Sequence, residues 1–321
     1  YVMSQSILSL FIGFLVGAIS TTFIPIMADH MKNSSQDETN HFVRNTYSLS
    51  ILIVLLISAV LLIFTRPVVT LFAPQFTASA TDLTIFMTRI LLPTSLFSIL
   101  VTLGCAMLQN HNRFLIPAAI GLPANAILIV GMLIFSRKYG IYGLGVITVI
   151  SMAAQTIFLI PSLRETGFHY RPVLDLRDPG LRRVGVLVVP VLIGSSLGQV
   201  NALIDRMLAS GLPEGSVAAL NFSNRLTMFL VGLLQASILS VYYTSMSKLN
   251  AAGETDSLKR MLRSTINTLL VIVIPGSIGF MILRLPIVQL VFERGLFDRN
   301  ASEMTSVALF YYAIGLIGYA L

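Results

Sequence analysis

The 321-residue sequence predicts an all-α, polytopic transmembrane bundle of about nine helices, built as two lobes that are parallel repeats of each other. Three observations predict this fold class. The chain is 55% hydrophobic and only 11% charged, whereas soluble domains carry about 25% charged residues. Its mean hydropathy is +0.84, and bilayer-length apolar runs recur along the whole chain. The first two runs, with their connecting loops, also recur 219 residues later.

Nine apolar segments are long enough to span a bilayer, which takes about 20 residues. Each is expected to be a helix, because a helix satisfies its own backbone hydrogen bonds in hydrocarbon. The segments run approximately over 7–27, 46–65, 83–108, 114–135, 141–163, 184–209, 216–247, 264–283 and 304–321.

Glycine and proline residues punctuate the segments in a way that membrane helices tolerate. The first segment carries Gly13 and Gly17, one turn apart, which favours close helix packing. Prolines that predict kinks follow in the third, fourth, sixth and eighth segments, at Pro93, Pro117, Pro123, Pro190 and Pro275.

Loop charges predict the orientation. One set of alternate loops holds twelve Lys and Arg residues and the opposite set holds seven, so the first set should be cytoplasmic.

The longest polar loop lies on that side and predicts the domain organisation. We expect an N-terminal lobe over 1–165 that lacks its first helix, a cytoplasmic linker over 166–183, and a C-terminal lobe over 184–321 that lacks its last helices.

The repeat supports these lobes. With a shift of 219, ten of the 35 positions from Asp37 to Leu71 are identical, including Pro67 with Pro286, against two or three expected by chance. After a two-residue insertion the match continues. The repeated segments are six apart, so they cross the membrane in the same direction. We therefore expect this chain to be an internal fragment of a protein with at least twelve helices and a site between its lobes.

Few charges interrupt the apolar segments, and each costs several kcal/mol at mid-membrane. Arg225 lies nine residues into the seventh segment, about 14 Å from its start. An arginine cannot lose its charge, and its guanidinium suits phosphate. Arg225 is therefore a candidate phosphate ligand in a central cavity, the alternative being a structural ion pair.

Two further charges are weaker candidates. Arg89, two turns inside the third segment, either extends to the membrane interface or contacts an anion at the cavity mouth. Asp205, at the outer end of the sixth segment, is either an interfacial charge or the ligand of a coupling cation, Na⁺ or H⁺.

Other classes of function find little support. The single cysteine, Cys105, excludes an internal disulfide and a CxxC metal site, and the four histidines lack metal-ligand spacing. We find no Walker A motif, no GxSxG motif and no paired carboxylates on one helix face, so we expect no enzyme activity and no cofactor or metal apart from a coupling ion. The net charge of +7 is explained by cytoplasmic loops, so no nucleic-acid partner is expected.

Four stretches resemble the MurJ/MviN family of lipid II flippases, and the resemblance extends over the whole chain. Residues 17–29 resemble the end of the family's second helix, and 108–118 resemble the loop between its fourth and fifth. Residues 215–226 resemble the start of its eighth helix, and 288–297 resemble the loop after its ninth. The span 6–12 departs from the arginine-rich segment of many members, and Val16 stands at an acidic position.

The resemblance implies an exporter-type fold of the multidrug/oligosaccharidyl-lipid/polysaccharide exporter superfamily. It also implies transport of lipid II, an undecaprenyl-pyrophosphate-linked glycopeptide, from the inner to the outer leaflet of the bacterial cytoplasmic membrane, by a protein expected to be a monomer. Arg225 falls on the cavity arginine of helix eight, and Asn224 replaces the aspartate before it. Ser216 falls on a small polar residue, Arg89 on a basic one, and Asp205 on an acidic ion ligand of helix seven.

Alternatives remain within and beyond this family. The chain is otherwise expected to export another lipid-linked oligosaccharide, or to be a cation-coupled multidrug exporter. Arg225 argues against the exporter of cationic drugs, which favours acidic and aromatic cavity residues. A membrane enzyme acting on polyprenyl phosphates should show clustered carboxylates or histidines, which the sequence lacks.

Overall fold

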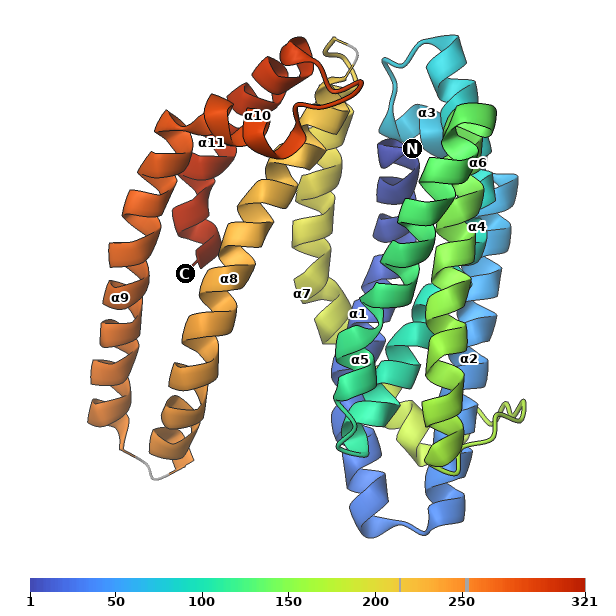
Figure 1. The fold of residues 1–321 in the computed structure, drawn as a ribbon. Coiled ribbons are helices and arrows are strands. Elements are labelled where there is room, and N and C mark those ends of the chain that lie inside the picture. The colour runs from blue at the N-terminus through green and yellow to red at the C-terminus, as the bar shows by residue number, and fades with distance from the viewer. Residues whose placement is uncertain (214, 252–253, 321) are drawn as a thin grey trace. The chain divides into compact units, whose positions relative to one another are not determined.

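The computed structural model describes residues 1–213, 215–251 and 254–320; within the helices, the side chains of 14, 136–138, 195–199, 202–203, 206, 233–245, 247–248, 250–251 and 320 lie outside the description. The described chain is helical, without strands, and forms two compact units, Tyr1–Gly211 and Leu212–Leu321 (Figure 1). Seven of its helical segments are long and apolar enough to cross a membrane. The predicted all-α, multi-pass fold class is confirmed.

The first unit is built around α1 and α4, which pack against each other along their lengths, with α7 beside α1 and both α2 and α6 beside α4. Its helices are α1 (Val2–Asn33), α2 (Gln36–Ile63), α3 (Thr65–Phe72), α4 (Ala78–Asn110), α5 (Leu115–Ala119), α6 (Gly121–Glu165) and α7 (Pro179–Ala209). α6 is two helices joined at Gly140, whose φ of 51° breaks the regular backbone between the predicted fourth and fifth segments.

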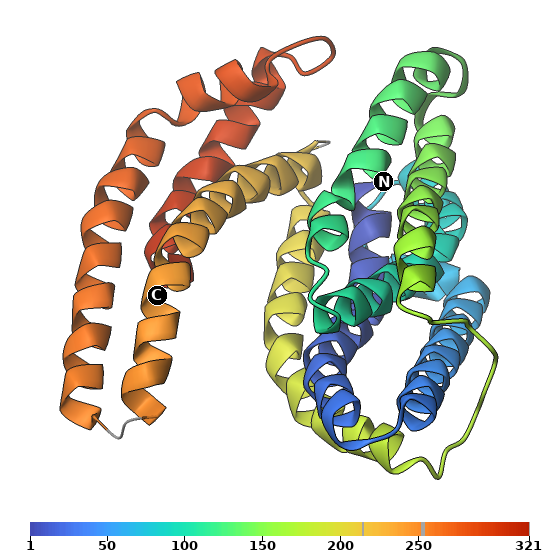
Figure 2. The ribbon, with the colours of Figure 1, turned by 60° about the horizontal axis from the view of Figure 1, so that its bottom comes forward.

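The second unit contains α8 (Ser216–Ala251), α9 (Thr255–Ile282), α10 (Arg284–Phe292) and α11 (Arg299–Ala320). α8, α9 and α11 run side by side in both views (Figures 1 and 2) and contact one another pairwise. Short α10 packs against α11.

The prediction of about nine helices omitted two short ones, α3 and α10, and it did not separate the short α5 from the rest of the segment predicted over 114–135. α3 and α10 have only 8 and 9 residues, too few to register as bilayer-length runs. The long helices also extend beyond the apolar runs. α2 begins at Gln36 rather than near 46, because Ser35 and Glu38 form a capping box that satisfies the backbone N–H groups of its first turn.

The predicted repeat is confirmed by the helix bounds. Shifted by 219, α2 maps onto 255–282, the bounds of α9, and α3 maps onto 284–291, within α10. Shifted by 221, the start of α4 maps onto Arg299, where α11 begins. Core positions repeat as well: Val54 and Val273, at equivalent places in α2 and α9, are 0% and 1% exposed.

The repeat extends to one hydrogen bond. In the first unit the Ser4 Oγ of α1 donates to the Thr84 carbonyl of α4 over 3.1 Å. In the second unit the Ser223 Oγ of α8 donates to the Thr305 carbonyl of α11 over 2.8 Å. Both serines are fully buried. The two units therefore use the same polar link to hold their two central helices in register.

The compact units and the predicted lobes are drawn by different criteria. The units follow packing, and α7 packs against α1, so the first unit runs on to Gly211. The lobes follow the repeat, in which α1–α4 correspond to α8–α11. The predicted linker over 166–183 thus stays a prediction, although α7 begins within it, at Pro179.

Candidate functional site

Arg225 is held on an outward face of α8 by the packing of the opposite face. Ser223 and Thr227, both fully buried, lie one turn apart, and Ser223 bonds the Thr305 carbonyl of α11. Arg225 follows Ser223 by two residues, a rotation of about 200° about the helix axis, so it points away from α11. Its side chain is exposed and makes no hydrogen bond or ion pair with any described residue. The predicted candidate is thus a free cation, and the structural ion pair finds no partner among the described residues.

The other two candidates on α8 differ in their relation to Arg225. Asn224 is its half-buried neighbour. Ser216 begins the helix, and its Oγ donates to the Pro213 carbonyl over 2.8 Å. Nine residues separate Ser216 from Arg225, two and a half turns, which places them on opposite faces about 14 Å apart along the axis. Asn224 thus adjoins Arg225 along the chain, whereas the helix places Ser216 on the opposite face.

Arg89 and Asp205 belong to the first unit, on α4 and α7. Both side chains are exposed, and neither has an ion pair among the described residues. Among the residues that the structure describes, no three His, Cys, Asp or Glu side chains lie close enough together to hold a metal ion.

A basic stripe on α9 was missed by the sequence analysis, which counted its arginines only as loop charges. Because α9 begins at Thr255, these residues lie on the helix and share one face at a spacing of three to four residues. They line an open hollow of about 470 Å³, whose described lining comes entirely from α9. The polar members of this stripe are Arg260, Arg263, Ser264, Asn267 and Thr268.

The two arginines of the stripe, Arg260 and Arg263, form no ion pair with any described residue. Arg260 is exposed and donates only to Ser257 Oγ, at 3.2 Å, among the described residues. Arg263 is exposed and bonds no described residue. An exposed, unpaired guanidinium is free to bind a phosphate oxygen through two N–H groups. The helical period of residues 260–268 would have revealed the stripe if α9 had been predicted to begin before Ser264.

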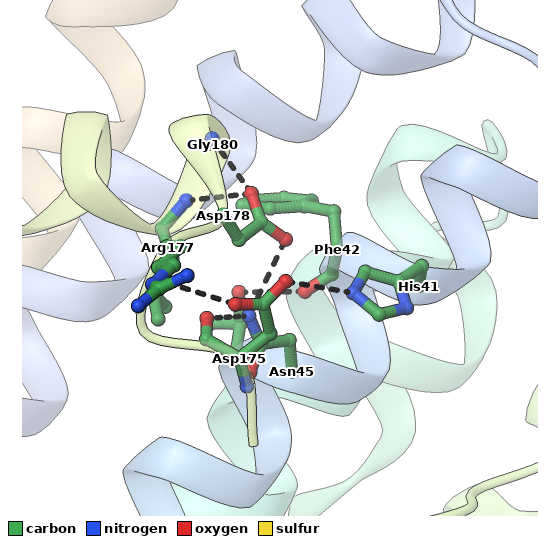
Figure 3. Close-up of polar contacts among 9 residues, drawn as sticks. His41, Phe42, Asn45, Asp175, Arg177, Asp178 and Gly180 are labelled. Atoms are coloured by element: carbon green, nitrogen blue, oxygen red, sulfur yellow. Dashed lines mark hydrogen bonds and ion pairs between the residues drawn. The ribbon is translucent and has the colours of Figure 1, made fainter. Parts of the chain in front are cut away.

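A second polar cluster fastens the linker to α2, and Figure 3 shows it. Asn45, fully buried, donates through Nδ2 to the Asp175 carbonyl at 2.7 Å and to Asp178 Oδ2 at 3.3 Å. Its Oδ1 accepts from the Asp175 backbone N–H at 2.9 Å. His41 Nε2 lies 3.7 Å from Asp175 Oδ2. We call the contacts of Asn45 with Asp175 and Asp178 the linker clamp.

The linker clamp also positions the start of α7. Asp178 Oδ1 accepts from the backbone N–H groups of Gly180 and Leu181, at 2.7 and 3.2 Å, and so caps the helix. Nearer the start of the linker, Arg44 Nε donates to the His169 carbonyl at 2.8 Å. One buried asparagine therefore couples α2 to the first turn of α7.

Comparisons with known proteins identify the family. The family model described as lipid II flippase MurJ matches residues 5–321. A probable lipid II flippase MurJ from Rickettsia prowazekii is 27% identical over 315 residues, covering 96% of this chain and 61% of the relative. Lipid II flippase MurJ from Burkholderia cenocepacia is 26% identical, covering 95% and 61%. The chain thus spans about three fifths of the length of these relatives.

Solved structures share the fold. Lipid II flippase MurJ in an inward closed conformation aligns with a TM-score of 0.81 at 22% identity, covering 99% of this chain and 67% of that one. An inward-facing multidrug resistance MATE family transporter of the MOP superfamily aligns with a TM-score of 0.69 at 18% identity, covering 99% and 76%. The chain forms a multi-pass protein of the bacterial cytoplasmic membrane, and it belongs to the MurJ lipid II flippase family.

Proposed function

We propose that this chain forms part of a flippase that moves lipid II from the inner to the outer leaflet by alternating access. The observation that carries the proposal is Arg225, a free guanidinium on a membrane-length helix. A permanent charge at that depth is costly unless it meets an anion or water. A pyrophosphate supplies the anion, and its oxygens suit the guanidinium fork.

The α9 stripe gives the headgroup an earlier contact. Arg225 lies about 14 Å from the outer start of α8, whereas Arg263 lies eight residues, about 12 Å, into α9 from the end predicted to be cytoplasmic. We therefore propose two anion-binding sites at different depths of the second unit, one at Arg260 and Arg263 and one at Arg225. The pyrophosphate first meets Arg260 and Arg263, then Arg225, while the polyprenyl tail stays in the bilayer.

The driving force follows from the sign of the charge. A membrane potential that is negative inside favours outward movement of an anion by about 2.3 kcal/mol per charge per 100 mV. Asp205 is our candidate for binding a coupling cation, Na⁺ or H⁺. If it does, Asp205→Asn should abolish the dependence of transport on the corresponding ion gradient, measured in vesicles at fixed potential. Unchanged dependence would exclude Asp205 from coupling.

The fold is shared with multidrug transporters, but the exposed charged side chains proposed here as binding residues are arginines, whereas a cationic drug requires acidic or aromatic residues. Arg225, Arg260 and Arg263 repel cations and attract anions. We therefore expect no drug efflux, and no covalent chemistry on the substrate, from this family member.

The test uses cells that depend on the full-length protein for growth. Lipid II with its headgroup outside is measured with an impermeant reagent that modifies or cleaves only exposed headgroups. Wild type should restore exposure after depletion, and Arg225→Ala should not, although it inserts in the membrane at normal abundance. Arg182→Ala removes an exposed arginine of α7 that lies outside the α9 stripe; it is the matched control and should restore exposure.

Unchanged exposure after complete depletion, in cells without a second flippase, would exclude lipid II as the substrate. Restoration by Arg225→Ala would instead exclude Arg225 as the substrate contact and leave the family assignment intact.

A further inference from the structure

A pocket in the first unit lies outside the proposed transport residues. It has a volume of about 470 Å³ and lies between α2, α4, α6 and the linker. Its lining includes Tyr47, Ile51, Leu100, Ile160, Arg164 and Phe168, and we call it the Tyr47 pocket. Most of this lining is apolar, and the polar groups gather at the end where α6 meets the linker.

The Tyr47 pocket contains an unsatisfied polar group. Tyr47 is 5% exposed, and its buried hydroxyl has no hydrogen-bond partner. The ring packs against Phe168, with centroids 5.3 Å apart. A Cβ at Gly104 would lie 3.6 Å from the hydroxyl and only 3.1 and 3.3 Å from Leu159 and Leu163, so this glycine lets α6 pack closely beside the hydroxyl. Because an unmade hydrogen bond of a buried hydroxyl costs about 1–3 kcal/mol, the site is suited to a ligand with an acceptor or donor at this depth.

The mouth of the Tyr47 pocket carries a free cation. Arg164, in the last turn of α6, is exposed and bonds no described residue. The neighbouring Glu165 is already paired with Arg113 and so does not neutralise it. His169 and Tyr170 of the linker also line the mouth. This end of the unit is the one predicted to face the cytoplasm, where anionic headgroups attract basic side chains.

The two helices α2 and α6, which form walls of the pocket, expose large apolar side chains that suit contact with lipid tails. Leu52 on α2 is 41% exposed, and Ile157 and Ile160 on α6 are 64% and 38% exposed. Large apolar side chains exposed on membrane helices face hydrocarbon. Because Ile160 also lines the Tyr47 pocket, the pocket combines a wall residue that faces hydrocarbon with a basic mouth at the interface.

We infer that the Tyr47 pocket binds an anionic phospholipid of the cytoplasmic leaflet. Arg164 holds the phosphate, the Tyr47 hydroxyl bonds the glycerol ester region, and one acyl chain lies along Ile51, Leu100 and Ile160. Because Phe168 and Tyr170 of the linker form part of the wall, the bound lipid also holds the linker against α2. The inference does not depend on the substrate of transport.

The test is lipid retention by the full-length protein, measured by native mass spectrometry with equal amounts of dioleoylphosphatidylglycerol and dioleoylphosphatidylcholine. Wild type should retain phosphatidylglycerol preferentially. Arg164→Gln should reduce that preference about fivefold, the effect expected of one cation near an anionic surface. Tyr47→Phe should weaken retention of both lipids and keep the preference, because it removes an uncharged contact.

Arg182→Gln is the matched control, since Arg182 is an exposed cation in the first turns of α7 and does not line the Tyr47 pocket. It should leave both retention and preference unchanged. Thr156→Phe fills the Tyr47 pocket from α6 and should abolish retention. An equal loss of preference in Arg164→Gln and Arg182→Gln would overturn the inference, because general surface charge would then explain it. Normal retention by a folded Thr156→Phe protein would also overturn it.

Discussion

The helices α1–α4 and α8–α11 share one scaffold but differ at the position equivalent to Arg225. Both bury a serine, Ser4 or Ser223, that bonds the partner helix. Two residues later, α8 carries the exposed Arg225, whereas α1 carries Ser6, which is 6% exposed and bonds the Val2 carbonyl of its own helix at 2.7 Å. The repeat is therefore kept where helices pack, and it is broken where a charge is presented.

A second difference lies on α2 and α9. The polar face of α2 includes Arg44 and Asn45, and the linker covers it with the contacts described above. The equivalent residues of α9 are Arg263 and Ser264, which line an open hollow. The same helix face thus serves as an anchor in one unit and remains available for an anion in the other.

The largest expected effect comes from placing the α8 charge at the equivalent position of α1. Ser6→Arg buries an unpaired guanidinium, which should destabilise the protein by more than about 3 kcal/mol. Little folded protein should survive detergent solubilisation, as measured by size-exclusion chromatography of a fluorescent fusion. Ser6→Ala is the control and should behave as wild type. Equal yields of the two variants would show that Ser6 is not enclosed.

Breaking the linker clamp should have an intermediate effect. Asn45→Ala removes three hydrogen bonds and leaves buried partners unpaired, at a cost of about 2–4 kcal/mol. Hydrogen–deuterium exchange in 167–178 should accelerate accordingly. Ser264→Ala, at the equivalent place in α9, should change stability by less than about 0.5 kcal/mol, because its side chain bonds no described residue. Similar exchange in both variants would contradict the assigned role of Asn45.

The smallest expected effects separate the two repeat-related arginines. Arg263→Gln should weaken capture of lipid II about threefold to fivefold without changing thermal stability, because Arg263 is free. Arg44→Gln should lower stability by about 1 kcal/mol through the lost bond to the His169 carbonyl, and leave capture unchanged. Thermal unfolding and lipid II binding, measured on the same samples, distinguish these outcomes. Reversed effects would show that α9, not α2, is the covered face.

The sequence was sufficient for the long helices and for the repeat, because hydrocarbon enforces both the length and the helical state of each span. The break at Gly140 falls between the fourth and fifth predicted segments, and Arg225 was recognised as a charge in an apolar run. The short helices α3 and α10 were missed, although Pro67, Val69 and Leu71 recur as Pro286, Val288 and Leu290 in these supposed loops. Repeated apolar residues within a loop were the available signal.

Other features depend on contacts that no local pattern reveals. Asn45 bonds residues 130 and 133 positions away, so its role required the tertiary structure. The unpaired state of Arg164 and Arg263 also depends on where neighbouring carboxylates fall; Glu165 is occupied by Arg113. Ser216 was named with Arg225 only through the family resemblance, and two and a half turns of helix place the two on opposite faces.

Binding of the lipid II pyrophosphate by Arg225 is decided by measuring equilibrium binding of lipid II to the purified full-length protein. Arg225→Ala should weaken binding about 10- to 100-fold, the loss expected for hydrogen bonds to a charged group. Arg225→Lys should lose less, because it keeps the charge but not the bidentate geometry. Equal affinity in wild type, Arg225→Lys and Arg225→Ala would contradict the claim.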